Sequence, residues 1–386
     1  MVGRRPDADL AQRLEHWLHA HPVADGSPMP SERTLARVLE TSRWAIRQAM
    51  IELAEHGRIE TSGPGRRITS VTDASAIHQA VLVVSGLPTI QLRDHSTLSI
   101  HETMFSALSQ AIESAGYTEI MVPPGPDLIP RLLALAYRRP VGIIIFPGAT
   151  IDPELVRILP SLREHQIPVT FFGDLLREVP VGAVTVHGDH FRGSEQLVTW
   201  FHHRQARRLL YVSARSLDAQ SSWWERQRFL GAQDTCRRLG MKALQRIDLP
   251  QLTYTGDEPS FHRLQTLVLV GYLHAALTVG EPIDGIMVVN DGLCFAVAAA
   301  CRQLGKVPVL VGYDATWLKH QPLIAVHGVV QSATIDPNLQ DLGRALLATL
   351  LTNHFLINPE PVLVGPRLID LTIASDVTPP NPHGRN

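Results

Sequence analysis

Two serine-led segments near the amino terminus constrain the fold of this chain more than any other feature. Ser31 precedes one short apolar pattern, and Ser42 precedes a second about eleven residues later. A serine in front of a helix can accept a hydrogen bond from the unpaired N–H groups of the first turn. The apolar positions that follow are spaced by three and four residues, as on one face of a helix: Leu35, Ala36, Leu39, Ile46, Ala49, Met50 and Leu53. The spacing predicts a helix-turn-helix whose two short helices bury these faces.

A short hairpin is predicted directly after the second helix. Residues 58–61 and 67–71 have the composition of two strands, and Gly63-Pro64-Gly65-Arg66 separates them. Glycine accepts positive φ angles without steric cost, so this segment can form the turn, with Arg66 at its tip. A helix-turn-helix with such a wing can place its second helix in a DNA major groove while the wing touches phosphate or the minor groove.

The arginines of this region are the candidate DNA contacts. Arg43 and Arg47 lie four residues apart on the second predicted helix, away from its apolar face. Residues 1–72 carry ten arginines against nine aspartates and glutamates, so binding would depend on where the arginines lie and not on net charge. The alternative is that both arginines are solvated charges on an exposed helix. The capped first helix and the wing beside them favour DNA contact.

From about residue 10 to residue 71 the chain resembles the GntR family of winged-helix regulators. The residues that carry the resemblance are Pro30-Ser31-Glu32-Arg33, Leu35-Ala36, Ser42-Arg43, Ile46-Arg47, Leu53, Gly57 and the Gly-x-Gly-Arg wing. The resemblance implies DNA contacts from the positions of Arg33, Ser42, Arg43, Trp44, Arg47 and the wing residue Gly65, to which the predicted wing tip adds Arg66.

The chain departs from the family pattern at two places. Glu40-Thr41 stands where the family usually has Gly-Val, so the turn between the helices lacks its left-handed glycine. Trp44 stands where a small residue is common, and it can either read bases or pack. Either departure could alter the preferred DNA sequence.

After residue 79 the pattern changes to apolar strands that alternate with amphipathic helices. The predicted strands are 80–84, 118–122, 141–147, 169–172, 183–186, 208–212, 244–247, 285–289 and 309–312. The predicted helices are 101–116, 131–138, 155–165, 193–203, 226–239, 261–278 and 293–304. This alternation is typical of right-handed βαβ units in open parallel sheets. We expect two such sheets, with ligand bound between them beyond the carboxyl ends of the strands.

Residues 80–375 resemble the LacI/GalR regulators and the periplasmic sugar-binding proteins. The landmarks are Pro140 to Ile145, Ile167-Pro168-Val169, Asp189 before Gly193, Arg226 with Gly231, Asp284-Gly285-Ile286, Asn290-Asp291, Val311 to Asp314, and Thr334-Ile335-Asp336 before Gly343. A GntR head on such a body resembles the arabinose-repressor type.

The predicted fold is therefore α/β, with an N-terminal winged helix-turn-helix and a two-lobed, periplasmic-binding-protein-like domain with parallel sheets. The head spans residues 1–72, a linker spans 73–79, and the effector-binding domain spans 80–386. The first lobe is expected at about 80–185 with a helix at about 338–353, and the second at about 186–330 with the C-terminal strand.

The second resemblance implies an effector site between the lobes. Arg226, Asn290 and Asp314 match family positions that hydrogen-bond the effector. Arginine offers a planar fork of donors, asparagine donates and accepts, and an ionised aspartate accepts only. Asp174 follows a predicted strand near a position where an acidic residue often reaches a sugar, although its register is shifted by one residue. Asp189 is expected to cap the following helix rather than to touch ligand.

Aromatic side chains could supply a stacking wall for a sugar ring. The candidates are Phe146, Trp223, Trp224 and Tyr313. Core packing is the alternative for each of them, and it is the reading favoured for Tyr313. Trp223 and Trp224 flank Arg226 in a serine-rich segment, which favours a place near the ligand.

Composition and missing motifs narrow the function. No apolar run reaches the roughly 18 residues of a membrane span, and the N-terminus has no apolar signal core, so a cytoplasmic protein is expected. Cys236, Cys294 and Cys301 lack metal-type spacing and are expected to be buried thiols; neither a metal nor a cofactor is expected. There is no Gly-x-Ser-x-Gly elbow, phosphate-binding loop or Gly-x-Gly-x-x-Gly motif, so we do not expect an enzyme.

The leading hypothesis is a transcription regulator, by resemblance a repressor. It would be a homodimer that binds double-stranded operator DNA under the control of a small effector, expected to be a sugar or sugar derivative. The alternative hypothesis is the solute-binding component of a transporter, which the second part of the chain would fit but the first part would not.

Overall fold

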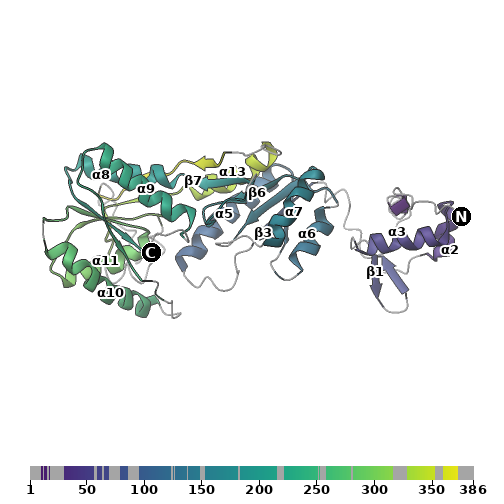
Figure 1. Ribbon diagram of the computed structural model, residues 1–386, viewed down its shortest axis with the longest axis horizontal. Helices are drawn as coiled ribbons and strands as arrows, with labels where there is room; N and C mark the ends of the chain where they lie inside the picture. Colours follow the sequence, from purple (N-terminus) through teal and green to yellow (C-terminus); the bar gives the residue numbers. More distant parts are fainter. Residues whose placement is uncertain are drawn as a thin grey trace, which may run out of the picture.

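A head and two α/β lobes make up the computed structural model, and they lie in a row with the head at one end (Figure 1). The structure describes residues 10–11, 13–14, 17, 30–55, 59–62, 65–68, 79–85, 95–122, 125, 127–136, 138–147, 153–180, 183–214, 221–250, 252, 258–279, 281–315, 328–352 and 360–372. The predicted linker, apart from Gln79, and the polar segment 86–94 lie outside these residues.

The head is built on the two predicted helices, α2 (Glu32–Val38) and α3 (Arg43–Glu55). The Ser31 hydroxyl accepts a hydrogen bond from the Thr34 N–H at 3.2 Å, and the Ser42 hydroxyl accepts one from the Ala45 N–H at 3.1 Å. All seven predicted apolar positions are buried in one cluster, which also holds Leu10, Ala11 and Leu14. The helix-turn-helix is therefore confirmed, including the serine at the start of each helix.

The wing is an antiparallel pair of strands, β1 (Ile59–Ser62) and β2 (Gly65–Ile68). The prediction of a hairpin is confirmed, but the second strand begins earlier than expected. Ser62 pairs with Gly65 and Thr61 with Arg66, so the connection is limited to residues 63–64. Arg66 therefore lies within a strand and not at the tip of the turn. Gly65 lies directly opposite Ser62, the last residue of β1, so the paired part of β2 begins at Gly65.

The turn between α2 and α3 has the left-handed conformation that its sequence disfavours. Glu40 has a φ of 50°. A side chain with a Cβ adopts this region at a steric cost that glycine avoids. Glu40 therefore stands in place of the usual glycine at a position whose backbone conformation suits glycine.

The first lobe is a six-stranded sheet in the order β13-β7-β6-β5-β3-β4, in which every neighbouring pair is parallel. Its strands are β3 (Ala80–Ser85), β4 (Thr118–Val122), β5 (Gly142–Phe146), β6 (Val169–Phe172), β7 (Val184–Gly188) and β13 (Val362–Val364). Its helices are α5 (His95–Ser114), α6 (Leu128–Ala136), α7 (Pro153–Glu164) and α13 (Leu339–Thr352).

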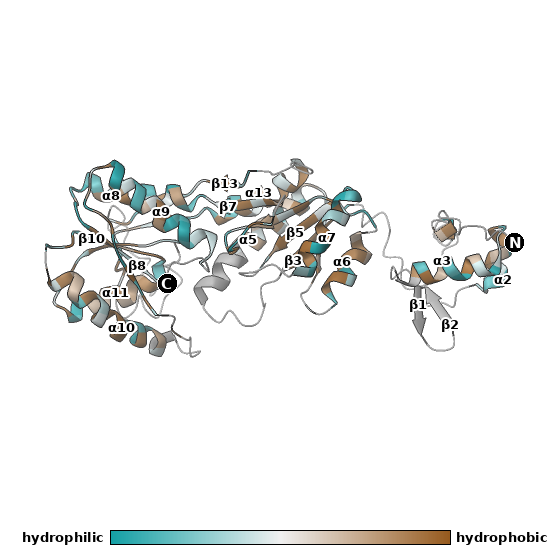
Figure 2. Ribbon diagram, in the orientation of Figure 1, coloured by the Kyte–Doolittle hydropathy of each residue, from teal (hydrophilic) through white to brown (hydrophobic). Residues whose placement is uncertain are grey.

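Both faces of this sheet are covered, as the unbroken apolar strands require. Ile144 and Phe146 belong to the cluster with Met104 of α5 and Leu346 of α13. Their neighbours in β5 alternate to the opposite face, where the cluster includes side chains of α6 and α7. Figure 2 shows β3 and β5 in brown between the flanking helices. Two faces of apolar side chains therefore make this lobe a three-layered α/β structure.

The second lobe is a six-stranded sheet in the order β14-β12-β11-β10-β8-β9. Its strands are β8 (Leu209–Ser213), β9 (Gln245–Asp248), β10 (Gly285–Val288), β11 (Val309–Val311), β12 (Ala333–Asp336) and β14 (Arg367–Asp370), of which only β14 runs antiparallel to its neighbour. Its helices are α8 (His190–His203), α9 (Trp223–Arg238), α10 (Glu258–Thr278) and α11 (Asp291–Gln303). Figure 1 shows α8 and α9 on one side of the sheet and α10 and α11 on the other.

The chain passes between the two sheets three times. It crosses from β7 to α8 at residues 188–190, from β12 to α13 at 336–339 and from β13 to β14 at 364–367. The strand predicted at 183–186 lies at the expected boundary between the lobes, and as β7 it pairs with β6 in the first sheet. The local pattern of a strand does not tell which sheet it joins, because that depends on its partner. Asp189 caps α8 by accepting from the Arg192 N–H at 3.0 Å, as predicted.

The packing of α8 against α9 depends on a glycine. A Cβ on Gly231 would lie 2.3 Å from the carbonyl oxygen of Phe191, whereas a Cβ on Gly271 in α10 would have no atom within 4 Å. We expect Gly231→Ala to lower the free energy of unfolding by about 2 kcal/mol, because the two helix backbones must separate. The matched change Gly271→Ala should raise it by about 0.5–1 kcal/mol, because alanine favours helix over glycine. Thermal unfolding of the full chain measures both, and equal effects would contradict the close-packing argument.

Candidate functional site

The second helix of the head presents a polar and aromatic surface to solvent. Arg43 is exposed at the first turn of α3, and Trp44 beside it is 57% exposed. Trp44 therefore does not pack in the core of the head, which was one of its two predicted roles. Ser42 is exposed as well, and its hydroxyl is engaged in the cap of α3.

Arg47 is exposed but already has a partner. Its Nε donates to Glu32 Oε1 at 3.1 Å and its second terminal nitrogen donates to Glu32 Oε2 at 2.9 Å. These hydrogen bonds raise the pKa of the Arg47 guanidinium. The two-bond geometry ties α3 to α2 and orients the guanidinium across the face that carries Arg43. Glu32 was part of the matched motif, but its pairing with Arg47 was not predicted.

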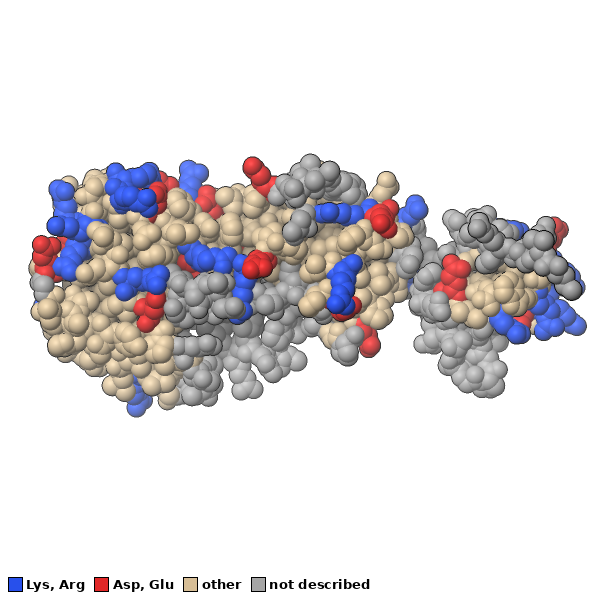
Figure 3. All heavy atoms as spheres, viewed as in Figure 1, with Lys and Arg blue, Asp and Glu red and all other residues tan. Residues whose placement is uncertain are grey.

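Basic side chains gather at the end of the head farthest from the lobes (Figure 3). The exposed arginines of α2 and α3 are Arg33, Arg37, Arg43 and Arg47. Gly65 and Arg66 lie in β2, and the side chain of Arg66 is not among the described ones. The described surface of the head thus carries four exposed arginines, an exposed tryptophan and the capped start of α3. Side chains of these kinds are suited to contact duplex phosphates.

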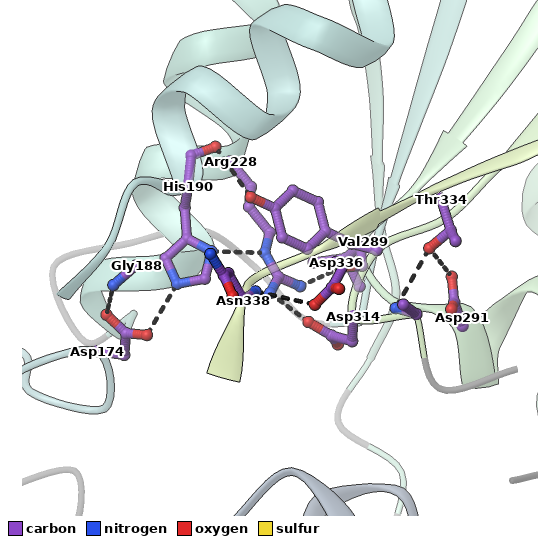
Figure 4. Close-up of polar contacts among 12 residues, drawn as sticks. Asp174, Gly188, His190, Arg228, Val289, Asp291, Asp314, Thr334, Asp336 and Asn338 are labelled. Atoms are coloured by element: carbon purple, nitrogen blue, oxygen red, sulfur yellow. Dashed lines mark hydrogen bonds and ion pairs between the residues drawn. The ribbon is translucent and has the colours of Figure 1, made fainter. Parts of the chain in front are cut away.

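A second constellation lies at the carboxyl ends of the strands of the second lobe, and its centre is Arg228. This side chain is only 3% exposed. It forms an ion pair with Asp314, its NH1 donates to the carbonyl oxygen of Val289 at 2.6 Å, and its Nε donates to His190 Nδ1 at 3.4 Å. Figure 4 shows these partners converging on the guanidinium from α8, α9 and the ends of β10 and β11.

Two aromatic rings enclose the same guanidinium. The Cζ of Arg228 lies 3.6 Å from the ring centroid of Tyr313 and 4.4 Å from that of Trp224. A cation over an aromatic face is stabilised by the quadrupole of the ring, and more strongly where water is excluded. Burial alone would lower the pKa of Arg228, but the neighbouring Asp314 carboxylate raises it above its ordinary value. The guanidinium therefore stays charged although it is buried.

Of the two predicted loop residues, Asp314 contacts this arginine, and Asn290 directly follows Val289, whose carbonyl oxygen accepts from it. Asp314 has a left-handed φ of 94°, which turns its carboxylate toward Arg228. Asn290 precedes α11 and its side-chain oxygen accepts from the Leu293 N–H at 2.9 Å, so it caps that helix. The next residue, Asp291, is fully buried and accepts from the Thr334 hydroxyl at 2.8 Å. The ends of three adjacent strands thus contribute one polar network.

Arg226 and Trp223 have a different role, because both bind the first lobe. Arg226 donates to the carbonyl oxygens of Ser221 at 2.6 Å and of Arg177 at 2.7 Å. The backbone N–H of Trp223 donates to the carbonyl oxygen of Leu176 at 2.9 Å. The loop after β6 therefore supplies acceptors to the start of α9, where N–H groups have no partner within the helix.

Asp174 closes the same contact between the lobes. It is buried, its Oδ1 accepts from the Gly188 N–H at 3.0 Å, and its Oδ2 lies 2.9 Å from His190 Nε2. Burial alone would raise its pKa, but His190 and His187 hold the pKa of Asp174 well below its usual value. The carboxylate is therefore charged, and its described partners are protein groups from the first crossing between the lobes.

Phe146 lies in the core of the first lobe and not on a wall. It is fully buried, with ring centroids 4.3 Å from Phe105 and 5.8 Å from Phe172. The alternative role of core packing therefore describes this residue. Tyr313 is also buried, yet one face of its ring covers Arg228.

The described residues show no group of three or more His, Cys, Asp or Glu side chains arranged to hold a metal ion. The three cysteines are buried and free, and burial raises the pKa of Cys236 to about 11 and of Cys301 to about 12. None of the helices in the described ranges has the length and apolar character needed to cross a membrane.

Comparison with known families decides the nature of the head. The sequence profile described as "Bacterial regulatory proteins, gntR family" matches residues 6–66. Residues 6–66 are a GntR-type DNA-binding domain. The match covers the helix-turn-helix and most of the wing.

The lobes behind the GntR-type head have the fold of LacI-family regulators. A regulatory protein of the LacI family from Chloroflexus aggregans superposes with a TM-score of 0.55 at 16% identity, over 75% of this chain and 97% of that chain. A putative LacI-family transcriptional regulator from Rhizobium etli gives 0.54 at 14% identity, over 76% and 98%. A complex of the transcriptional regulator CelR with cellobiose gives 0.51 at 16% identity, over 88% and 98%. No curated protein matches this chain in sequence.

The two findings together place a GntR-type head on a LacI-type body, as the sequence predicted. A DNA-binding head has no place in the solute-binding component of a transporter, so the chain is a DNA-binding regulator. Apart from Phe146 in the core of the first lobe, the predicted effector residues fall into two groups. Trp224 and Asp314 contact Arg228 and Asn290 follows Val289, which accepts from Arg228, whereas Trp223, Arg226 and Asp174 join the lobes.

Arg228 was missed by the sequence analysis, which chose Arg226 two residues earlier. One signal was available. Trp224 and Arg228 are four residues apart, and in a helix that begins at Trp223 this spacing stacks the two side chains. Arg226 points from a different part of the helix, toward the loop after β6. The phase of α9 relative to the strand ends was needed to choose between them.

The buried ion pair predicts a large effect when its acid is removed. Asp314→Asn leaves Arg228 buried without a counter-charge, so we expect the free energy of unfolding to fall by about 3 kcal/mol. The control is Asp234→Asn in α9, the helix of Arg228. It removes a partly exposed carboxylate that pairs with Arg238 and should cost less than about 1 kcal/mol. Denaturant unfolding of the full chain compares them. Similar losses would mean that the Arg228–Asp314 pair is not desolvated.

Proposed function

We propose that this chain is a transcription repressor whose affinity for operator DNA is set by a small polyhydroxyl effector bound beside Arg228. The observation that carries the proposal is one chain with a GntR-type head and a LacI-type body in which a buried arginine, an aspartate and two aromatic rings converge. The CelR structure contains cellobiose, which supports a carbohydrate class for the effector.

The chemistry of the second constellation suits a sugar. Arg228 donates hydrogen bonds to His190, Val289 and Asp314, and a guanidinium has five N–H donors. A carboxylate oxygen of Asp314 and the face of Trp224 stand beside it. A ring hydroxyl can accept from arginine and donate to aspartate at once, while the apolar face of the ring packs on an aromatic side chain. We assign Arg228, Asp314 and Trp224 as effector contacts, with Asn290 at their edge.

Control of DNA binding would act through the relative position of the lobes. An effector that contacts both lobes stabilises one arrangement by its differential affinity. We further propose a homodimer, because winged helices commonly read paired half-sites and a change between two bodies would change the spacing of two heads. A repressor of this kind acts in the cytoplasm, where its DNA is.

The DNA contacts predict a loss of operator binding. A duplex selected from a random library by the full chain serves as the operator. Removing two guanidinium groups by Arg43→Ala with Arg47→Ala should weaken binding by about 2–6 kcal/mol and make the salt dependence shallower, since fewer phosphates are neutralised. Arg157→Ala, at an exposed site on α7, is the control and should bind like wild type. A gel-shift titration measures all three proteins, and undiminished binding by the double variant would refute the assignment of α3.

The effector site predicts a thermal shift that depends on Arg228. The full chain is screened against neutral monosaccharides, disaccharides and sugar phosphates. A compound present at about 100 times its Kd should stabilise the body by about 2.7 kcal/mol. Arg228→Met should abolish this shift, while Arg226→Ala should keep it, because Arg226 binds carbonyl groups between the lobes. A shift that survives Arg228→Met and disappears in Arg226→Ala would reverse the assignment.

A further inference from the structure

His190 is a buried histidine that stands between two charged groups from different lobes. It is 3% exposed. Its Nε2 lies 2.9 Å from Oδ2 of Asp174, in the loop after β6, and its Nδ1 lies 3.4 Å from Nε of Arg228, in α9. Figure 4 shows the imidazole between the carboxylate and the guanidinium. One ring thus connects the first lobe to the arginine of the effector site.

The two neighbours determine which ring nitrogen carries a proton. Arg228 Nε can only donate, so His190 Nδ1 must accept and be unprotonated. A neutral imidazole with a bare Nδ1 has its proton on Nε2, and this N–H donates to Asp174. The chain of donors therefore runs from Arg228 through a neutral His190 to the Asp174 carboxylate. A protonated ring would set an N–H against the Arg228 N–H and a second positive charge beside the guanidinium.

The other groups around His190 agree with this arrangement. The ring of Tyr313 lies 5.5 Å away and its hydroxyl donates to the His190 carbonyl oxygen at 3.5 Å. His187 of β7 faces the other oxygen of Asp174 at 3.5 Å, and Asp314 balances the charge of Arg228 from the far side. Among the described residues, the charged groups in direct contact with the ring are thus one carboxylate and one guanidinium. The carboxylate of Asp174 faces the protonated Nε2 of a neutral ring, and the guanidinium of Arg228 donates to its bare Nδ1.

The place of His190 in the chain makes this bridge sensitive to the lobes. It is the first residue of α8 and ends the first crossing, and Asp174 binds the backbone of Gly188 in that same crossing. A rotation of one lobe against the other would change the distance from His190 to Asp174 while α8 and α9 keep His190 close to Arg228, since these helices pack around Gly231. The contact on the Asp174 side is therefore the one that lobe movement alters.

We propose that His190 is a positioning residue: a neutral bridge that orients Arg228 for the effector and links that orientation to Asp174 in the first lobe. The role of Arg228 toward an effector rests on the proposed function; the bridge itself does not. One consequence is a response to acid. When Nδ1 of His190 takes up a proton, Arg228 loses its acceptor and turns from the ring, so the effector site changes with the protonation of this histidine.

Nuclear magnetic resonance of the full chain tests the bridge without DNA or effector. Histidine rings and arginine side chains carry ¹⁵N, and each signal is assigned by the loss of one peak in the variants His190→Gln, His190→Asn and Arg228→Lys. We expect His190 in the Nε2–H tautomer at neutral pH. We also expect the Arg228 Nε–H signal to shift in step with protonation of the His190 ring when acid is added.

The two variants at position 190 separate the halves of the bridge. Asparagine keeps an oxygen near the place of Nδ1 and cannot reach Asp174, whereas glutamine keeps an N–H near the place of Nε2 and leaves no acceptor at the place of Nδ1. Hydrogen exchange of the Arg228 Nε–H should be about tenfold faster in His190→Gln and close to wild type in His190→Asn. A change of tyrosine packing alone would affect both variants alike.

An Nδ1–H tautomer or a doubly protonated ring in the wild-type protein at neutral pH would overturn the proposal. So would an Arg228 signal that ignores both the titration of His190 and the glutamine variant. If the chain bound no operator, or no sugar raised its melting temperature, the proposed function would be refuted and these measurements would be unaffected. The two failures can therefore be told apart.

Discussion

The buried guanidinium of Arg228 is the constraint on which the arrangement of the second lobe depends. A buried charge is tolerated only where a counter-charge and hydrogen-bond acceptors replace water. Here the counter-charge comes from Asp314 after β11, one acceptor from the end of β10 at Val289, another from the start of α8 at His190, and an aromatic face from α9 itself at Trp224. Each partner belongs to a different element, so the site exists only when all of these elements are in register.

The same region joins the lobes, because the start of α9 in the second lobe and the buried Asp174 in the first lobe each find hydrogen-bond partners outside their own lobe. The N–H groups at the start of α9 are satisfied by carbonyl oxygens at Asp174 and Leu176 of the first lobe, and Arg226 adds a side-chain bond to Arg177. Asp174 in turn holds the crossing segment at Gly188. Arg228, the centre of the buried network, and Arg226, which binds the first lobe, are therefore two residues apart in one helix. A ligand that alters Arg228 acts next to the bonds that set the relation between the lobes.

The head follows a simpler rule, since its described contacts join residues of one short stretch of the chain. Two caps, one apolar cluster and the Glu32–Arg47 pair hold α2 and α3 together. The left-handed Glu40 shows that this packing overrides an unfavourable local conformation. Because these contacts join neighbouring parts of the chain, the pattern of the head is local in the sequence, and residues 6–66 match a known family.

The sequence by itself determined the elements whose causes are local. Serine caps and three- and four-residue spacings predicted α2 and α3, and the apolar runs predicted the alternation of strands and helices in both lobes. The resemblance to LacI/GalR regulators predicted the loop residues Asn290 and Asp314 as effector contacts, and both follow buried strands. Tertiary structure alone decided which sheet β7 joins, that Phe146 faces the core, and that Arg228 rather than Arg226 meets Asp314. The last choice depends on the rotation of α9 about its axis, which is set by the close contact of Gly231 with Phe191 and by the first-lobe loop at its N-terminus. These contacts join residues far apart in the chain, and no local pattern in the sequence encodes them.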